Sequence, residues 1–229
     1  MLAVAGAGRS MGSRELARLL DLEPTRTNRL LRTLAELGLT HQDAARKYLP
    51  GAGMHVLSAM SLFGSQLVRR SLWTLQTLHD LGGVVAMGVL WRDQVAYLYH
   101  AEPGMEASQA LGRVGLYPAT RSSMGIMLLA HQPKRLIADL YREREIPGFV
   151  NLTSLRATLA LARQQGWAKV KSDEGGVSLA VPIAAPNQPP CSAIAVSGHF
   201  AARQLRKILQ TIQAAQARIQ KEAFNNAKG

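Results

Sequence analysis

The sequence is poor in cysteine and in aromatic residues. Its 229 residues include one cysteine, Cys191, and 5% aromatic residues. A single thiol cannot form an internal disulfide, which fits the reducing cytoplasm. The longest apolar run, from Val84 to Trp91, is far shorter than the roughly 18 residues of a membrane span. Residues 1–12 carry no basic segment ahead of an apolar one, so we expect neither a signal peptide nor a membrane partner.

Acidic residues are also scarce. The chain has 15 Asp and Glu against 27 Lys and Arg, a formal net charge of +12. The excess is distributed over the whole chain, with 8 basic and 5 acidic residues in residues 1–50 alone. A strongly basic balance favours an anionic partner, and the plainer alternative is a solvated basic surface. Which of these two interpretations applies depends on where the charges lie along the chain.

Patterns typical of enzymes and metal sites are missing. The sequence contains no phosphate-binding G-x-x-x-x-G-K-[ST] loop and no S-x-x-K. The six histidines are isolated from one another, without the spacing of metal ligands. Cys191 has no paired base nearby in the sequence. We therefore expect no catalytic residue, no metal and no cofactor.

Residues 1–50 predict short helices followed by a β-hairpin. Leu16, Leu19 and Leu20 are spaced as one face of a helix that begins after Gly12 or Ser13 and ends near Asp21. Pro24 suits the first position of a second helix, and Gly38 suits its end. The apolar face of this second helix comprises Thr27, Leu30, Leu31, Leu34 and Leu37. Residues 39–41 and 47–49 predict the two strands of the hairpin.

Helix, tight turn, second helix and hairpin make a winged helix-turn-helix. The second helix carries a polar, basic face opposite its leucines, which is how a helix reads the major groove of double-stranded DNA. The hairpin adds a basic tip that can meet phosphates. The residues expected to contact operator DNA are Thr25, Arg26, Asn28, Arg29 and Arg32 in the helix, and Arg46 and Lys47 in the wing.

The rest of the chain predicts a linker helix and a mixed domain. Residues 51–64 predict the linker. Helices are expected at 68–79, 123–130, 133–143, 155–165 and 202–223, with Thr153 as the cap of the fourth. Strands are expected at 84–90, 94–99, 177–183 and 193–197. The fold class is therefore α+β, with an α/β domain after the helix-turn-helix.

Two stretches resemble the IclR-type bacterial transcriptional regulators. Glu15-Leu16-Ala17, Arg29-Leu30-Leu31 and Gly38 match the family's DNA-binding pattern, and residues 118–130 resemble its P-x-x-x-[SA]-x-x-G-x-x-x-L-A stretch. The resemblance implies a winged helix-turn-helix domain (1–50), a linker helix (51–64) and a GAF-like effector-binding domain with a C-terminal helix (65–229). Three departures are Asp21 for the usual glycine, Ile126 for a common lysine, and only residues 2–5 for a full first helix.

A candidate effector site begins at Ser122. The predicted loop-to-helix junction there offers free backbone N–H groups, which favour an anion such as a carboxylate. The family places its effector at this junction and on the facing strands. The resemblance therefore implies effector contacts from Ser122, Ser123, Met124, Asp173, Ser178 and Ser197. The plainer alternative is that these serines only cap the helix and fill strand ends.

The sequence thus predicts a cytoplasmic, ligand-responsive regulator. The family resemblance implies a repressor of a catabolic operon whose DNA binding is modulated by a small organic acid. One recognition helix spans only a few base pairs, so we expect a homodimer or homotetramer. The alternative is a small-molecule-binding module or an enzyme whose helix-turn-helix is incidental.

Overall fold

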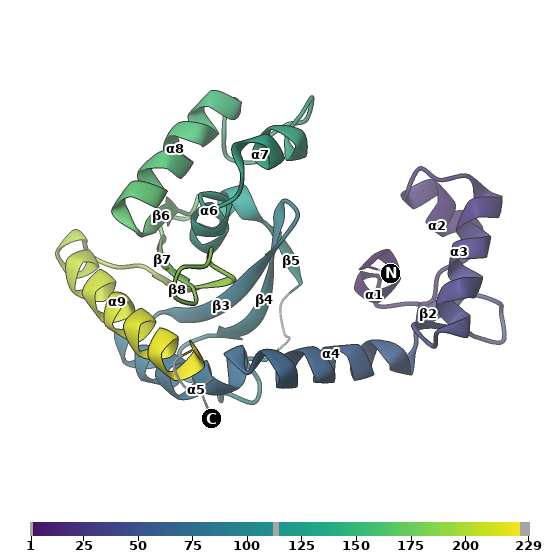
Figure 1. Cartoon of the computed structure of the whole chain (residues 1–229), viewed down its shortest axis with the longest axis horizontal. Helices are drawn as coiled ribbons and strands as arrows, with labels where there is room; N and C mark the ends of the chain where they lie inside the picture. The colour runs from purple at the N-terminus through teal and green to yellow at the C-terminus, as the bar shows by residue number, and fades with distance from the viewer. Residues whose placement is uncertain (1, 112–114, 225–229) are drawn as a thin grey trace. The chain divides into compact units, whose positions relative to one another are not determined.

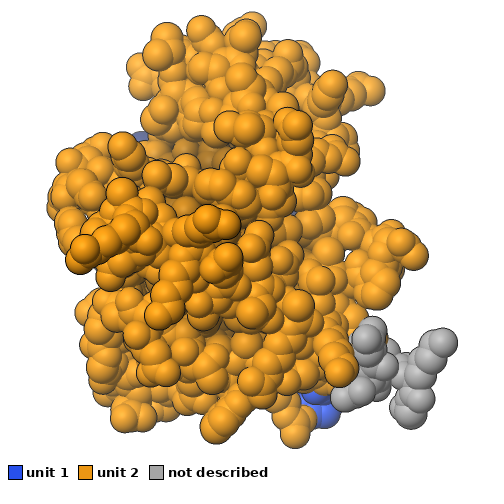
Figure 2. Space-filling model, turned by 90° about the vertical axis from the view of Figure 1, so that its left-hand side faces the viewer, with its two compact units in different colours: residues 1–66 blue, residues 67–229 orange. Residues whose placement is uncertain are grey.

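The chain folds as two compact units. The computed structural model describes residues 2–111 and 115–224. Unit 1 comprises residues 1–66 and unit 2 residues 67–229 (Figure 1), and Figure 2 shows one face of unit 2. Helices and antiparallel strands occur together, which confirms the α+β class. No helix within the described ranges combines the length and hydropathy of a membrane span.

Unit 1 contains the predicted helices and hairpin. Its elements are α1 (Leu2–Gly6), α2 (Ser13–Leu19), α3 (Pro24–Glu36), β1 (Thr40–Gln42), β2 (Tyr48–Pro50) and α4 (Ala52–Ser65). Pro24 occupies the first turn of α3, as predicted. The side chain of Glu23 caps α3 by accepting hydrogen bonds from the backbone N–H groups of Thr25 and Arg26, a contact that the sequence analysis missed. Both strands begin one residue later than predicted.

The core of unit 1 is small. It consists of Val4, Met11, Leu16, Leu31 and Tyr48. Thr27 is also buried, but Leu30 and Leu37 of the predicted α3 face are exposed. Leu19 and Leu20 are exposed as well, so the predicted apolar faces of both helices were too wide. The core of five side chains buries only the central part of the apolar face of each of these two helices.

Unit 2 is built on a six-stranded antiparallel sheet. Its helical elements are α5 (Leu67–Thr77), η1 (Leu78–Leu81), η2 (Ala119–Arg121), α6 (Ser123–Leu129), α7 (Lys134–Leu140), α8 (Leu152–Gln165) and α9 (Ala202–Phe224). Its strands are β3 (Val84–Trp91), β4 (Gln94–Ala101), β5 (Leu116–Pro118), β6 (Ala168–Lys171), β7 (Val177–Ile183) and β8 (Ser192–Gly198). The strand order is β5-β4-β3-β8-β7-β6.

Several details of unit 2 differ from the sequence-based expectation. Strands β5 and β6 were not predicted, because three and four residues are too few to show alternation. Helix α7 ends at Leu140, three residues earlier than expected. Helix α8 begins at Leu152, and Asn151 caps it through a reciprocal pair of bonds with Ser154 in place of Thr153.

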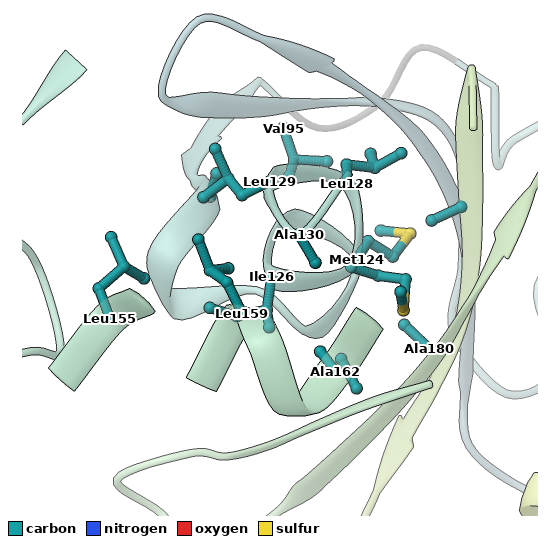
Figure 3. Packing of buried hydrophobic residues seen from close by; sticks show 14 of the residues in the cluster. Val95, Met124, Ile126, Leu128, Leu129, Ala130, Leu155, Leu159, Ala162 and Ala180 are labelled. Carbon is teal, nitrogen blue, oxygen red and sulfur yellow. The ribbon is translucent and has the colours of Figure 1, made fainter. Parts of the chain in front are cut away.

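The two faces of the sheet carry separate cores. Helices α6, α7 and α8 cover one face, and α5 and α9 cover the other (Figure 1). Every residue of α6 is buried. Figure 3 shows α6 at the centre of its cluster, with Leu155, Leu159 and Ala162 of α8 on one side and Ala180 of β7 on another. The position of α6 on the sheet is therefore fixed by packing on all sides.

A close backbone approach locks α6 against η2. A Cβ atom added at Gly125 would lie 2.1 Å from the backbone oxygen of Ala119. Real Cβ atoms do not approach an oxygen this closely, so only glycine allows the two segments to pack as they do.

We predict that Gly125→Ala destabilises unit 2 by about 2 kcal/mol or more, because a methyl group would force two backbone segments apart. Urea unfolding followed by circular dichroism measures the change. Gly115→Ala is the matched control, since a Cβ there meets nothing within 4 Å. Equal stabilities of the two variants would contradict the role of Gly125.

Candidate functional site

The predicted DNA-binding side chains form one face of α3. Thr25, Arg26, Arg29 and Arg32 are exposed, and Asn28 is half-buried. Thr25, Arg29 and Arg32 are spaced at i, i+4 and i+7, which places them in one stripe opposite the buried Thr27 and Leu31. The helix therefore presents a polar, basic face to solvent.

The wing places two cations at the tip of its hairpin. Asp43 closes the turn, since its Oδ1 accepts a hydrogen bond from the backbone N–H of Lys47 at 2.9 Å. Its backbone oxygen accepts another from the N–H of Arg46 at 2.9 Å. The bond from Lys47 holds the pKa of the Asp43 carboxyl below its ordinary value. Arg46 and Lys47 are both exposed.

Unit 2 contains a cavity of about 840 Å³ between the start of α6, the segment η2 and strands β6 to β8. Five of the six predicted effector residues line it: Ser122, Ser123, Asp173, Ser178 and Ser197. Met124 is the exception. Its side chain is buried in the core, with its Cε facing Gly88 of β3, because consecutive residues of a helix point in different directions.

Three serines from three elements meet on the cavity floor. The Oγ atoms of Ser123 and Ser178 are 2.6 Å apart, and the Oγ of Ser197 donates to that of Ser178 at 2.7 Å. Ser178 of β7 lies directly opposite Ser197 of β8 in the sheet register. The sheet thus brings together hydroxyls that are far apart in the sequence.

Two further polar residues beside the serines were not singled out by the sequence. Tyr97 of β4 lines the cavity; burial raises the pKa of its hydroxyl, and a hydrogen bond with Ser122 opposes that rise. Thr120 of η2 is 3% exposed and lines the cavity, and its Oγ1 has no hydrogen-bond partner among the described residues. A buried hydroxyl without a partner is uncommon and can be satisfied by a ligand or water.

The predicted helix-dipole contribution at Ser122 is small. Helix α6 has only seven residues, and the Ser122 hydroxyl already accepts a bond from the Gly125 N–H at 3.3 Å. A full positive charge comes instead from Arg121, whose Nη2 pairs with Oδ2 of Asp173 at the cavity. The sequence signal was present, since a basic residue directly precedes the serines.

The remaining lining is partly apolar and partly polar, and its polar part includes Lys169, Lys171, Glu174 and His199. Ile126, Phe149 and Val170 contribute to the cavity wall. A cavity with apolar walls and a few converging polar groups is typical of a site for a small organic molecule. Within residues 2–111 and 115–224 no cluster of His, Cys, Asp and Glu could hold a metal ion.

A winged helix-turn-helix joined to a second, ligand-sized cavity domain defines a class of DNA-binding regulators. The model of the IclR helix-turn-helix domain matches residues 1–44, and that of the bacterial transcriptional regulator IclR C-terminal domain matches residues 59–221. The second match covers more than half of the chain. The protein belongs to the IclR family of bacterial transcriptional regulators.

Similar proteins agree with this assignment. The glycerol operon regulatory protein of Streptomyces coelicolor is 28% identical over 204 residues, covering 85% of this chain and 80% of that protein. The crystal structure of an IclR regulator from Silicibacter sp. TM1040 has a TM-score of 0.78 at 24% identity, covering 95% and 91%. An IclR homologue from Microbacterium hydrocarbonoxydans, in complex with 4-hydroxybenzoate, has a TM-score of 0.70 at 20% identity, covering 97% and 95%.

The Glu23 cap makes the stability of unit 1 depend on pH. The bonds from the backbone N–H groups of Thr25 and Arg26 lower the pKa of the Glu23 carboxyl from its ordinary value of 4.5. A lowered carboxyl pKa contributes stability that is present above 4.5 and is lost as the pH falls through the folded-state value.

We predict that Glu23→Ala lowers the melting temperature of unit 1 at pH 7, and that the difference from the wild type shrinks as the pH falls below 4.5 and the Glu23 carboxylate of the folded chain becomes protonated. Thermal unfolding followed by circular dichroism at several pH values measures this. Glu36→Ala, at the other end of α3, is the control and should not lose stability. A difference that stays constant with pH would refute the role of the Glu23 charge.

Proposed function

We propose that this protein is a repressor of a catabolic operon, and that a small organic acid bound in unit 2 modulates its binding to operator DNA. One observation carries the proposal. The same chain combines an exposed basic recognition helix in unit 1 with a ligand-sized, hydroxyl-lined cavity in unit 2. A ligand can alter DNA binding only if it has different affinities for two conformations of the protein.

The exposed face of α3 supports base reading. In this proposal Thr25, Arg26, Asn28 and Arg29 contact base edges near the start of the helix, and Arg32 extends the same face. The wing residues Arg46 and Lys47 sit on a tight turn with exposed cations, which suits phosphates better than bases.

The cavity supports an acid as the effector. Ser122, Ser123, Ser178 and Ser197 supply hydroxyls, and an arginine lies beside them. The homologue that binds 4-hydroxybenzoate has the same fold, so a domain of this kind accommodates an organic acid. We include Asp173 in the effector site through its contact with Arg121 and leave Met124 out, because its side chain lies in the core.

We also propose that the protein binds its operator as a homodimer or homotetramer. Helix α4 leaves a row of large apolar side chains exposed, including Met60 at 67% and Phe63 at 70% of their surface. Val56 and Leu57 are exposed on the same helix. A second copy of this chain would cover these side chains, and a symmetric pair of recognition helices would read two half-sites.

Because its target is operator DNA, we place the protein in the bacterial cytoplasm.

The competing hypothesis is an enzyme whose helix-turn-helix is incidental. The two differ in what a ligand does: an effector is released unchanged and alters DNA binding, whereas a substrate is converted to product. Mass spectrometry of each candidate acid after incubation with the protein separates them.

We predict that Arg26→Ala and Asn28→Ala each weaken binding to the specific operator by about 1–3 kcal/mol and relax base preference. Fluorescence anisotropy with operator DNA and with unrelated DNA of equal length measures both effects.

Lys47→Ala should instead weaken binding to both DNAs alike and reduce the slope of log K against log salt by about one unit.

Arg163→Ala is the control for loss of one positive charge, since this exposed residue of α8 lies in unit 2. If Arg26→Ala and Asn28→Ala leave operator affinity at the level of Arg163→Ala, α3 is not the reading helix.

We predict that Ser197→Leu abolishes the response to the effector while operator binding without ligand persists. Ser197 is half-buried and faces the cavity beside Ser178, so a larger side chain fills space that the ligand needs. Gel shifts of wild type and variant, with and without a panel of small acids, test this. Unchanged melting temperature verifies folding, and a ligand response that survives in the variant would rule out this cavity.

A further inference from the structure

Arg121 is a positive charge placed at the entrance of the effector cavity. It is the last residue of η2 and directly precedes Ser122. Its Nη2 donates to Oδ2 of Asp173, which lies in the turn between β6 and β7. The side chains of Arg121 and Asp173 are 45% and 86% exposed. The ion pair thus joins the α6 side of the cavity to the sheet side.

Lys169 and Lys171 of β6 also border the cavity, but the strand register assigns their side chains to the other face of the sheet. In β6, Lys169 and Lys171 stand opposite Leu179 and Val177 in the register. Both of these partners belong to the core under α9. The serine row instead shares a face with Val170, which stands opposite Ser178. Side chains alternate along a strand, so the lysine side chains point away from the cavity floor.

Thr120 supplies an independent sign of a ligand next to Arg121. Its hydroxyl is buried, lines the cavity and has no hydrogen-bond partner among the described residues. Buried polar atoms are nearly always paired in native proteins. A bound molecule that carries an oxygen beside Arg121 would satisfy it.

We propose that Arg121 binds the carboxylate of the effector, and that Asp173 is an internal competitor which occupies Arg121 until the acid displaces it. The inference rests on the proposed function, in which an acid fills this cavity. In this proposal Arg121 provides the specificity for anions, and Asp173 sets how strongly an acid must bind in order to displace it.

The chemistry favours the exchange. An exposed ion pair contributes little, because solvent screens it and two side chains must be ordered to form it. The guanidinium group has five N–H donors in a planar fork and can hold a carboxylate through two parallel bonds. An acid in the cavity would add contacts with the serine hydroxyls and with Phe149, which Asp173 cannot make.

The turn that carries Asp173 remains closed when the ion pair opens. The backbone N–H of Ser172 donates to the oxygen of Gly176 at 2.8 Å, and the N–H of Gly176 donates to Oγ of Ser172 at 2.9 Å. These bonds do not involve the Asp173 side chain. Its carboxylate can therefore leave Arg121 by rotation of the side chain into solvent.

Isothermal titration calorimetry of the full-length protein at 0.15 M salt tests the proposal. The probes are two acids, 4-hydroxybenzoate and glycerate, each paired with its neutral amide. We expect the wild type to bind an acid more tightly than the matching amide. Arg121→Gln should weaken binding of the acid by about tenfold or more and leave the affinity for the amide unchanged.

Asp173→Asn should have the opposite effect, because it removes the competitor while keeping the size of the side chain. We expect the affinity for the acid to rise by about twofold to fivefold, the range that an exposed ion pair contributes. Arg163→Gln is the control: it removes one positive charge from an exposed position of α8 that is not among the residues lining the cavity, and should leave the affinity unchanged.

The outcomes separate this inference from the proposed function. Equal losses in Arg121→Gln and Arg163→Gln would show a general field effect and overturn the role of Arg121. Weaker acid binding in Asp173→Asn would make Asp173 a direct contact and overturn the competition. Amides that bind as tightly as acids and still alter operator binding would refute this inference and leave a ligand-responsive regulator. No binding of any of the four probes would contradict both.

Discussion

The packing of α6 is the constraint on which the organisation of unit 2 depends. All seven residues of this helix are buried, and Gly125 brings it against Ala119 with no room for a side chain. A helix held on every side cannot shift without moving the sheet, because protein interiors are close-packed. The residues of η2 and the cap of α6 are therefore held at the cavity, although they belong to a short connecting segment.

Unit 1, in contrast, has only a small buried core. Its core contains five buried apolar side chains, and several leucines of α2 and α3 remain in solvent. Small cores leave a domain with little stability, since less apolar surface is removed from water. The cap at Glu23 and the closed turn at Asp43 add local order at the start of α3 and at the wing. Local hydrogen bonds thus hold the segments that we propose contact DNA, where the core is small.

Sequence reasoning was accurate where the signal is local. The 13 residues of α3 span several turns, so periodicity identified the helix and its exposed basic stripe. It failed for Leu30 and Leu37, because burial depends on which other elements cover a face. The meeting of Ser123, Ser178 and Ser197 was implied by family resemblance alone, since it depends on the pairing of β7 with β8 and on the placement of α6. Thr120, Arg121 and the direction of Met124 likewise depend on the tertiary structure.

Because the whole protein is positively charged, an ion pair at the cavity helps it to select among anions. A chain with a net charge of +12 attracts anions of every kind, so a bare arginine would discriminate poorly between them. Pairing Arg121 with Asp173 offsets the charge of that arginine. An anion must then compete with a carboxylate already in place, and only one that also contacts the hydroxyls and the apolar wall gains enough to displace it. Selectivity then arises from the difference between two competing carboxylates rather than from the strength of one contact.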